Sequence, residues 1–170
     1  MIVGQPGSGK STLARILGSV LDLPVVHIDH IHWQAGWIER SGAEKDRLCA
    51  EVHARERWIF EGGRSSTWNE RLERADTLVW LDVPLALRAW RVFMRTLRHR
   101  GQNRLDLPEG CPERFDWEFT VWIWKTRKSG RTQMHALYDS APNDVETYRL
   151  QRLTQVDAFV AGLREGCARD

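Results

Sequence analysis

Gly4-Gln5-Pro6-Gly7-Ser8-Gly9-Lys10-Ser11 fits the pattern G-x-x-x-x-G-K-[ST] at every fixed position. The glycines let the backbone turn tightly, so that successive amide groups can point at the oxygens of a bound phosphate. The apolar residues 1–3 precede the stretch as a short strand, and residues 12–18 have the composition of a helix. The positive end of that helix would face the same anion. We therefore interpret the stretch as a phosphate-binding loop.

A triphosphate is the ligand that this loop predicts. Lys10 would bring a mobile charge to the β- and γ-phosphates, and the Ser11 hydroxyl is placed to ligate Mg²⁺. The predicted cofactors are therefore ATP and Mg²⁺. The residues predicted to contact the nucleotide are Gly4, Gln5, Pro6, Gly7, Ser8, Gly9, Lys10, Ser11 and Thr12.

The composition is that of one globular unit. The chain has 170 residues, which suits a single domain over residues 1–170 with a core of its own. The three cysteines are scattered, no apolar run approaches the length of a membrane span, and no export signal is recognisable, so we expect a cytoplasmic protein without a membrane partner. A net charge of +2 is too small to indicate a polyanionic partner. The oligomeric state is left open.

Three further apolar runs each lead to an acidic residue, as buried parallel strands would. The runs cover residues 23–29, 58–64 and 77–84, and their acids are Asp29, Glu61 and Asp82. A weaker fifth strand is expected over residues 145–150, and an amphipathic helix over 153–163 closes the chain. Another amphipathic helix is expected over residues 41–58, with Ser41 and Glu44 as its capping box.

The three acids have different predicted roles. Ligands of open α/β sheets bind beyond the carboxyl ends of the strands, so Asp29 should lie near the phosphate loop and orient or deprotonate an acceptor hydroxyl. Capping of the next turn is the alternative for Asp29. Glu61 and Asp82 compete as the acid that holds Mg²⁺ together with Ser11. We favour Glu61, because the third strand should lie beside the strand of the phosphate loop.

Residues 30–37 follow on the same edge and contribute Trp33 and Trp37. The two indoles could stack on a substrate ring, and packing under a lid would explain them equally well. Arg64 is a candidate contact for a substrate anion. His27, His30 and His32 lie close together, and on a strand His30 and His32 would share one side. A zinc site therefore has to be considered, but no cysteine or further histidine nearby has the spacing of one.

A stripe of arginines marks the next helix. Arg88, Arg91, Arg95 and Arg98 recur at helical spacing after Pro84, and no acid occurs between Asp82 and Asp106. Such a density of guanidinium groups suits phosphate. The stripe predicts either a lid over the phosphates of a nucleotide, covering residues 98–115, or a surface that grips nucleic acid. A solvated helix face is the third possibility. Residues 113–128 are strongly aromatic and predict a helix packed on the sheet.

Taken together, these residues resemble the P-loop small-molecule kinases of the adenylate and shikimate kinase kind, and most closely the family known as DNA topology modulation protein FlaR-like, or adenylate-kinase-related. The likeness covers nearly the whole chain. The segments that carry it are 4–12, 23–24 with Asp29, Trp33 with 36–37, 58–59 with 61–62, 71–72 with 75–76, 81–82, the arginines from Arg88 onward, 110–115 and 122–124.

The resemblance implies an α/β P-loop fold in three layers, with a five-stranded parallel sheet in the order 2-3-1-4-5, helices on both faces and an arginine-rich lid. It also implies that Asp29 is the acid that faces the acceptor in shikimate-type kinases. The chain departs from its relatives at Glu61, where an Asp is expected, and at Arg64, where an aromatic residue is expected.

The function predicted from the sequence is an ATP- and Mg²⁺-dependent phosphotransferase that acts on a small acceptor, for instance a nucleoside monophosphate. Lys10, Asp29, Arg88, Arg91 and Arg95 are the predicted catalytic residues. One alternative is a nucleic-acid-binding regulator, related to DNA topology, with a nucleotide site. Another is a protein that senses ATP without transferring phosphate.

Overall fold

A five-stranded sheet forms the centre of the computed structural model, which describes residues 1–167, so that the end of the domain predicted over 1–170 lies outside the described residues. The order of the strands is β2-β5-β1-β6-β7, and every pair is parallel. Their bounds are Ile2–Gly4 (β1), Val25–His27 (β2), Ile59–Glu61 (β5), Thr77–Leu81 (β6) and Glu146–Leu150 (β7). Counted along the chain, this is the order 2-3-1-4-5, so the predicted fold class is confirmed.

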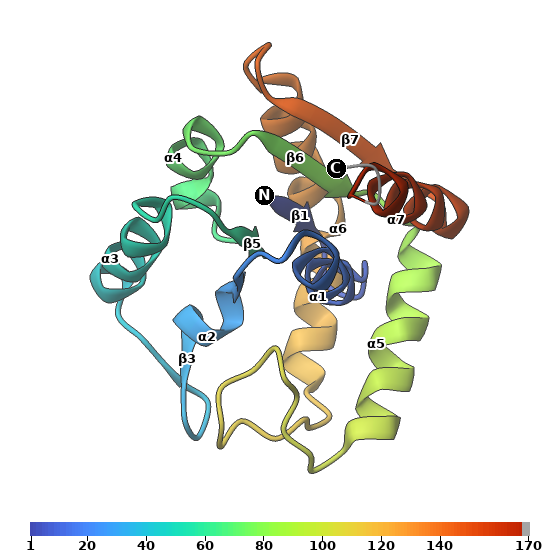
Figure 1. Ribbon diagram of the computed structural model, residues 1–170. Helices are drawn as coiled ribbons and strands as arrows, with labels where there is room; N and C mark the ends of the chain where they lie inside the picture. The colour runs from blue at the N-terminus through green and yellow to red at the C-terminus, as the bar shows by residue number, and fades with distance from the viewer. Residues whose placement is uncertain (168–170) are drawn as a thin grey trace.

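Helices cover both faces of the sheet, as predicted. They are α1 (Lys10–Leu21), α2 (Ile28–His32), α3 (Gly42–His53), η1 (Ser65–Thr67), α4 (Trp68–Glu73), α5 (Leu85–His99), α6 (Trp117–Asp139) and α7 (Leu153–Cys167). In Figure 1, α1 and α7 lie in front of the sheet and α6 passes behind it. No helix within residues 1–167 is both long and apolar enough to span a bilayer.

Alternation along the strands builds the two cores. Ile2, Val79 and Leu81 are buried against α1 and α7, whereas Val3 and Trp80 are buried against α4 and α6 on the other face. Successive side chains of a strand point to opposite faces, so a strand that is apolar throughout contributes to both cores at once. This arrangement fixes β1 at the centre of the sheet and presents the loop that follows it at the carboxyl edge.

The segment after β2 differs from its prediction. The strand ends at His27, and the short helix α2 contains Asp29, His30 and His32. His30 and His32 therefore do not lie on a strand, so they do not share one side of a strand as considered from the sequence. A small antiparallel hairpin of β3 (Trp33–Gln34) and β4 (Ile38–Glu39) follows, which the sequence did not predict because both strands are very short.

The aromatic helix also differs from its prediction. Helix α6 begins at Trp117 and packs on the sheet through Met134 and Leu137, in its second half. Trp122 and Trp124 of its first half are 50% and 57% exposed. Aromatic content alone therefore did not identify the part of the helix that packs. Residues 100–116, which connect α5 and α6, form the larger part of the predicted lid segment (98–115).

Candidate active site

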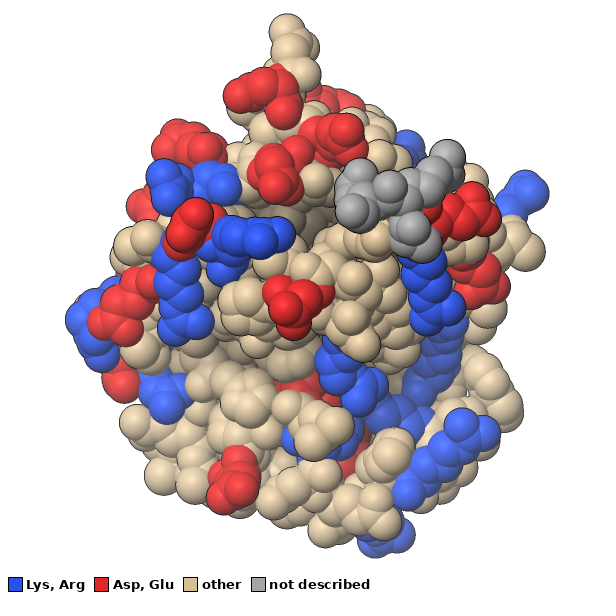
Figure 2. All heavy atoms as spheres, viewed as in Figure 1, with Lys and Arg blue, Asp and Glu red and all other residues tan. Residues whose placement is uncertain are grey.

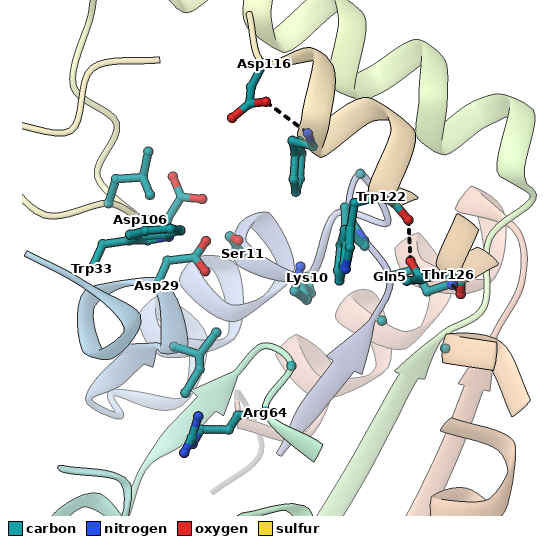
Figure 3. Close-up of a pocket in the computed structure, with 18 of the residues that line it drawn as sticks. Gln5, Lys10, Ser11, Asp29, Trp33, Arg64, Asp106, Asp116, Trp122 and Thr126 are labelled. Carbon is teal, nitrogen blue, oxygen red and sulfur yellow. Dashed lines mark hydrogen bonds between the residues drawn. The ribbon is translucent and has the colours of Figure 1, made fainter. Parts of the chain in front are cut away.

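A cavity of about 570 Å³ opens at the carboxyl edge of the sheet. The phosphate loop, α2, α6 and the lid segment all contribute to its lining. Figure 3 shows Lys10 and Ser11 at its centre, with Asp29, Trp33 and Asp106 on one side and Gln5 and Trp122 on the other. Residues from distant parts of the sequence thus meet around the loop that the sequence identified first.

The phosphate loop has the strand–loop–helix setting that its motif requires, since β1 ends at Gly4 and α1 begins at Lys10. Gly7 and Gly9 have φ angles of 77° and 99°, which side chains other than glycine rarely adopt. A Cβ on Gly7 would also lie 2.4 Å from the carbonyl oxygen of Arg88. No side chain caps the first turn of α1, so its amide groups stay available for an anion.

Glu61 lies at the end of β5 and is 1% exposed. Burial would raise its pKa, but the hydrogen bond from His27, the charge of Lys10 and the Ser11 hydroxyl together hold the pKa below its usual value. The imidazole Nδ1 of His27 lies 2.7 Å from Oε1, while Oε2 is buried without a hydrogen-bond partner in the described part of the chain, residues 1–167. An ionised carboxylate with one unused buried oxygen, close to Ser11, suits a water ligand of a metal ion.

Asp82, the competing acid, follows the other strand that borders β1. Both β5 and β6 pair with β1, so the position next to the loop strand does not distinguish the two acids. Their partners do. Arg131 and Arg149 approach the Asp82 oxygens to 2.8 and 2.6 Å, and the Gln151 amide donates to Oδ2 at 3.1 Å. The Asp82 carboxylate therefore links β6, β7 and α6 through these hydrogen bonds.

Asp29 lies in the first turn of α2 and lines the cavity. Burial raises its pKa, the charges of Glu61 and Asp106 raise it further, and Lys10 and Arg104 act in the opposite direction. A carboxylate with a raised pKa is a better proton acceptor at neutral pH than an ordinary Asp. Its place beside Ser11 and Lys10 lets it face a hydroxyl that approaches the phosphate loop (Figure 3).

The three arginines predicted to be catalytic have different surroundings. Arg88 is buried and donates to the carbonyl oxygens of Val83 and Pro6, and Arg91 donates to the carbonyl oxygen of Ser8 at 3.0 Å. These two support the outside of the phosphate loop, and neither lines the cavity. Of the three, only Arg95 lines the cavity. Figure 2 shows Lys and Arg side chains gathered over α5, on the right of that view.

The predicted substrate residues reach the cavity, although one of them is already paired. Trp33 and Trp37 line the cavity and pack edge to face, with ring centroids 5.5 Å apart. Arg64 also lines it, but its Nε and Nη2 donate to Oδ1 of Asp46 at 2.8 and 2.6 Å. The Arg64 guanidinium, which was predicted to contact a substrate anion, is therefore already paired with Asp46.

The lid segment contributes residues that sequence reasoning missed. Arg104 forms a two-pronged pair with Asp106, at 3.0 and 2.6 Å, and its Nη1 reaches Oε2 of Glu113 at 2.5 Å. Glu113 also accepts from Thr96 at 3.0 Å and lies 3.3 Å from the guanidinium of Arg95. These residues lie in an irregular segment without periodicity. The three acids between Arg104 and Arg114 were the one available signal, and they did not indicate which groups pair.

The lid pairs fix the charges on this side of the cavity. Burial would raise the pKa of Asp106, but the hydrogen bonds and charge of Arg104 outweigh it and lower the pKa to about 2. Asp106 is therefore a carboxylate at any physiological pH, next to the more readily protonated Asp29. The site therefore combines an anion-binding loop, a carboxylate (Glu61) placed to hold a metal-bound water, and a proton acceptor (Asp29).

Comparison with known proteins identifies the fold. No protein-family model and no curated protein matches the chain. A shikimate kinase from Acinetobacter baumannii, solved in complex with shikimate, matches with a TM-score of 0.57 and 19% identity, over 99% of this chain and 93% of that one. Shikimate kinase from Aquifex aeolicus has a TM-score of 0.47 and 18% identity over 99% and 98% of the two chains.

A sugar kinase from a Janibacter species has a TM-score of 0.47 and 13% identity, over 99% of this chain and 90% of that one. The first of these likenesses shows that the chain has the fold of a P-loop kinase, and identity this low carries no conclusion on activity. TM-scores below 0.5 add nothing to that conclusion. The resemblance to FlaR-like and adenylate-kinase-related proteins stays a prediction.

Proposed function

We propose that the protein is an ATP- and Mg²⁺-dependent kinase that phosphorylates a hydroxyl group of a small molecule. One observation carries this proposal: the phosphate loop shares a single cavity with a half-buried proton acceptor, Asp29, while the half-satisfied carboxylate of Glu61 lies close to Ser11. A protein that only senses ATP needs the loop but has no use for a carboxylate with a raised pKa beside it.

The residues of the loop and its neighbours have distinct tasks in this reaction. The amide groups at the start of α1 and the ammonium group of Lys10 hold the β- and γ-phosphates. Mg²⁺, when bound, would be held by Ser11 and, through water, by Glu61, and would screen the phosphate charge. Arg88 and Arg91 stabilise the loop from outside rather than contact the phosphates, so of the three predicted arginines we retain Arg95 alone as a catalytic group.

The chemical step needs a base and a position for the acceptor. Asp29 orients the acceptor hydroxyl and accepts its proton as the hydroxyl oxygen forms a bond to the γ-phosphorus. The bond between that phosphorus and the bridging oxygen breaks, and ADP leaves with both electrons of the bond. Closure of the lid segment, with its paired Arg104, would keep water from competing with the acceptor.

Three of the four arginines of the predicted stripe are already bound within the protein, which weakens the case for a nucleic-acid-binding role. Arg88 and Arg91 are bound to carbonyl oxygens of the phosphate loop, and Arg95 faces Glu113. A surface that grips nucleic acid needs its cations free for phosphate. We therefore do not carry this role further. A nucleoside monophosphate, the acceptor suggested from the sequence, would likewise need a free cation for its phosphate.

The test is Lys10→Ala, with Lys125→Ala as control. Removing the Lys10 charge should lower kcat by about 100-fold at saturating MgATP, which is about 2.7 kcal/mol of transition-state stabilisation. Lys125 is exposed on α6, outside the cavity lining, and its loss should change kcat less than twofold, on the scale of a neutral surface substitution. ADP release coupled to an acceptor is the measurement. Unchanged turnover in Lys10→Ala would contradict the proposed function.

A further inference from the structure

The acceptor half of the cavity is the side of Lys10 on which Asp29, Trp33 and Asp106 lie (Figure 3). Arg64, Arg95 and Arg104 also line the cavity. An anionic acceptor, whether a carboxylate or a phosphate ester, needs at least one cation that the protein has not already neutralised. The state of these guanidinium groups therefore decides the charge of the acceptor.

Each of the three guanidinium groups has a carboxylate partner. Arg64 binds Asp46 through two nitrogens and the Gly42 carbonyl oxygen at 3.1 Å. Arg104 binds Asp106 and Glu113. Arg95 shares Glu113, at 3.3 Å. An anion at Arg95 or Arg104 would have to displace Glu113 or Asp106 and leave that largely buried carboxylate unpaired, which is costly. At Arg64 an anion would have to compete with Asp46, whose side chain is 54% exposed.

Two cations of the lining lack a carboxylate partner within residues 1–167. Lys10 belongs to the phosphate loop. Arg114 is exposed, with its guanidinium 5.6 Å from the centre of the Trp37 ring. A charge in water at the rim of the lid segment attracts an anion weakly and does not select for one. Neither cation therefore makes the acceptor half an anion site.

The remaining groups suit hydroxyls. Asp29 forms no ion pair within residues 1–167, and the Asp106 carboxylate keeps lone-pair capacity beyond its bonds to Arg104. Trp33 and Trp37 offer indole surface beside these acids. Carboxylates that accept from hydroxyl groups, next to aromatic rings that cover C–H faces, form a pocket with few convergent polar groups and apolar walls.

We infer that the acceptor is an uncharged polyhydroxyl compound, such as a sugar, a sugar alcohol or the ribose of a nucleoside, and not an anion. The inference rests on the proposed function and narrows its acceptor to one class of compound. The product would be a phosphate monoester of that compound, formed by the transfer described above.

Matched pairs of acceptors test the inference. The full chain is assayed with MgATP and a nucleoside against its 5′-monophosphate, a hexose against its uronic acid, and a hexose against its amino sugar. Phosphorylated product is identified by mass spectrometry. The uncharged member of a pair should have a kcat/KM at least about tenfold higher, the factor that one lost charge-assisted hydrogen bond produces. A preference for the charged member, or no phosphorylated neutral product, would overturn the inference.

Failure of the inference and failure of the proposed function are separable. Titration of MgATP into the protein, with Lys10→Ala as control, reports on the phosphate loop alone. Saturable binding that Lys10→Ala weakens, together with preferred anionic acceptors, leaves a kinase and removes the uncharged acceptor. Absence of such binding removes both proposals.

Two variants on α3 test whether the pairing of Arg64 with Asp46 causes the preference for an uncharged acceptor. Asp46→Asn frees Arg64, so anionic acceptors should gain about tenfold in kcat/KM relative to neutral ones. Glu51→Gln disrupts the exposed pair with Arg47 on the same helix, outside the cavity lining, and should leave the ratio unchanged. A ratio that Asp46→Asn does not move would show that neutralisation of Arg64 does not set acceptor charge, and would overturn the inference.

Discussion

Glu61 and Asp82 end the two strands that border β1, yet the molecule uses them differently. Asp82 has Arg131, Arg149 and Gln151 around it, and both of its oxygens accept hydrogen bonds from them. Glu61 binds His27 and has one buried oxygen with no hydrogen-bond partner among residues 1–167. An apolar strand that ends in an acid is thus an ambiguous signal, because the neighbours of the acid decide between structure and chemistry.

The origin of the difference lies in the outer strand on each side. β7 and α6 bring two guanidinium groups to Asp82, whereas β2 brings an imidazole to Glu61. Two fixed cations saturate a carboxylate and lower its affinity for a metal ion, but a single imidazole orients it and leaves capacity for a water ligand. Substitutions at three residues probe this difference.

The largest effect is expected from Glu61→Gln. The amide keeps the shape of the side chain but cannot hold a metal-bound water as a carboxylate does, so kcat should fall on the order of 100-fold, with a higher Mg²⁺ requirement. Turnover measured against Mg²⁺ concentration checks this. Equal losses in Glu61→Gln and Asp82→Asn would contradict the different roles assigned to the two acids.

Asp82→Asn should act on stability rather than turnover. It leaves Arg131 and Arg149 without their counterion, and since both are partly exposed we expect a loss of about 1–2 kcal/mol in the free energy of unfolding. Urea denaturation gives this value, and kcat for the folded variant should match the parent protein.

The same pair predicts a pH dependence. Burial would raise the pKa of Asp82, but its hydrogen bonds from Arg131, Arg149 and Gln151 lower it to about 2, below the value of about 3.9 expected for the unfolded chain. The stabilisation is present above pH 4 and is lost as the pH falls toward 2. The stability difference between the parent protein and Asp82→Asn should therefore shrink between pH 5 and pH 3. A constant difference would contradict the prediction.

The smallest effect is expected at His27. Its hydrogen bond lowers the pKa of Glu61, so His27→Leu should raise that pKa and shift the acidic limb of the kcat profile to higher pH. His27→Asn retains a donor near the position of Nδ1 and should shift the limb less. The kcat profile from pH 5 to 8 is the measurement, and identical profiles for the two variants would show that the hydrogen bond has no influence.

The sequence predicted the sheet well, because strand patterns are local. Apolar runs such as residues 77–81 and the loop at Gly4–Ser11 sufficed for the strands, and the resemblance supplied their order. The direction in which the arginine stripe faces could not be predicted in this way, because it depends on packing against residues distant in the sequence. Spacing places Arg88, Arg91 and Arg95 on one face of α5, but only packing shows that two of them bind loop carbonyl oxygens.

The charge balance of the candidate site was harder to predict for the same reason. Arg64 and Asp46 are separated in sequence by β5 and the turn before it, and Arg104 binds two acids from an irregular segment. A list of cations shows that anions could be bound. Only the pairing shows which of those cations remain available.

The contacts of Gln5 restrict which residues can occur at positions 5 and 130. Its side-chain amide donates to the carbonyl oxygens of Thr126 and Arg127 in α6, and a Cβ on Gly130 would lie 3.0 Å from its Nε2. Gln5 occupies a position that the motif leaves variable, yet here it is constrained by a helix from the far end of the sequence. During evolution, residues 5 and 130 should have changed together, and a co-varying pair there would mark relatives that share this junction.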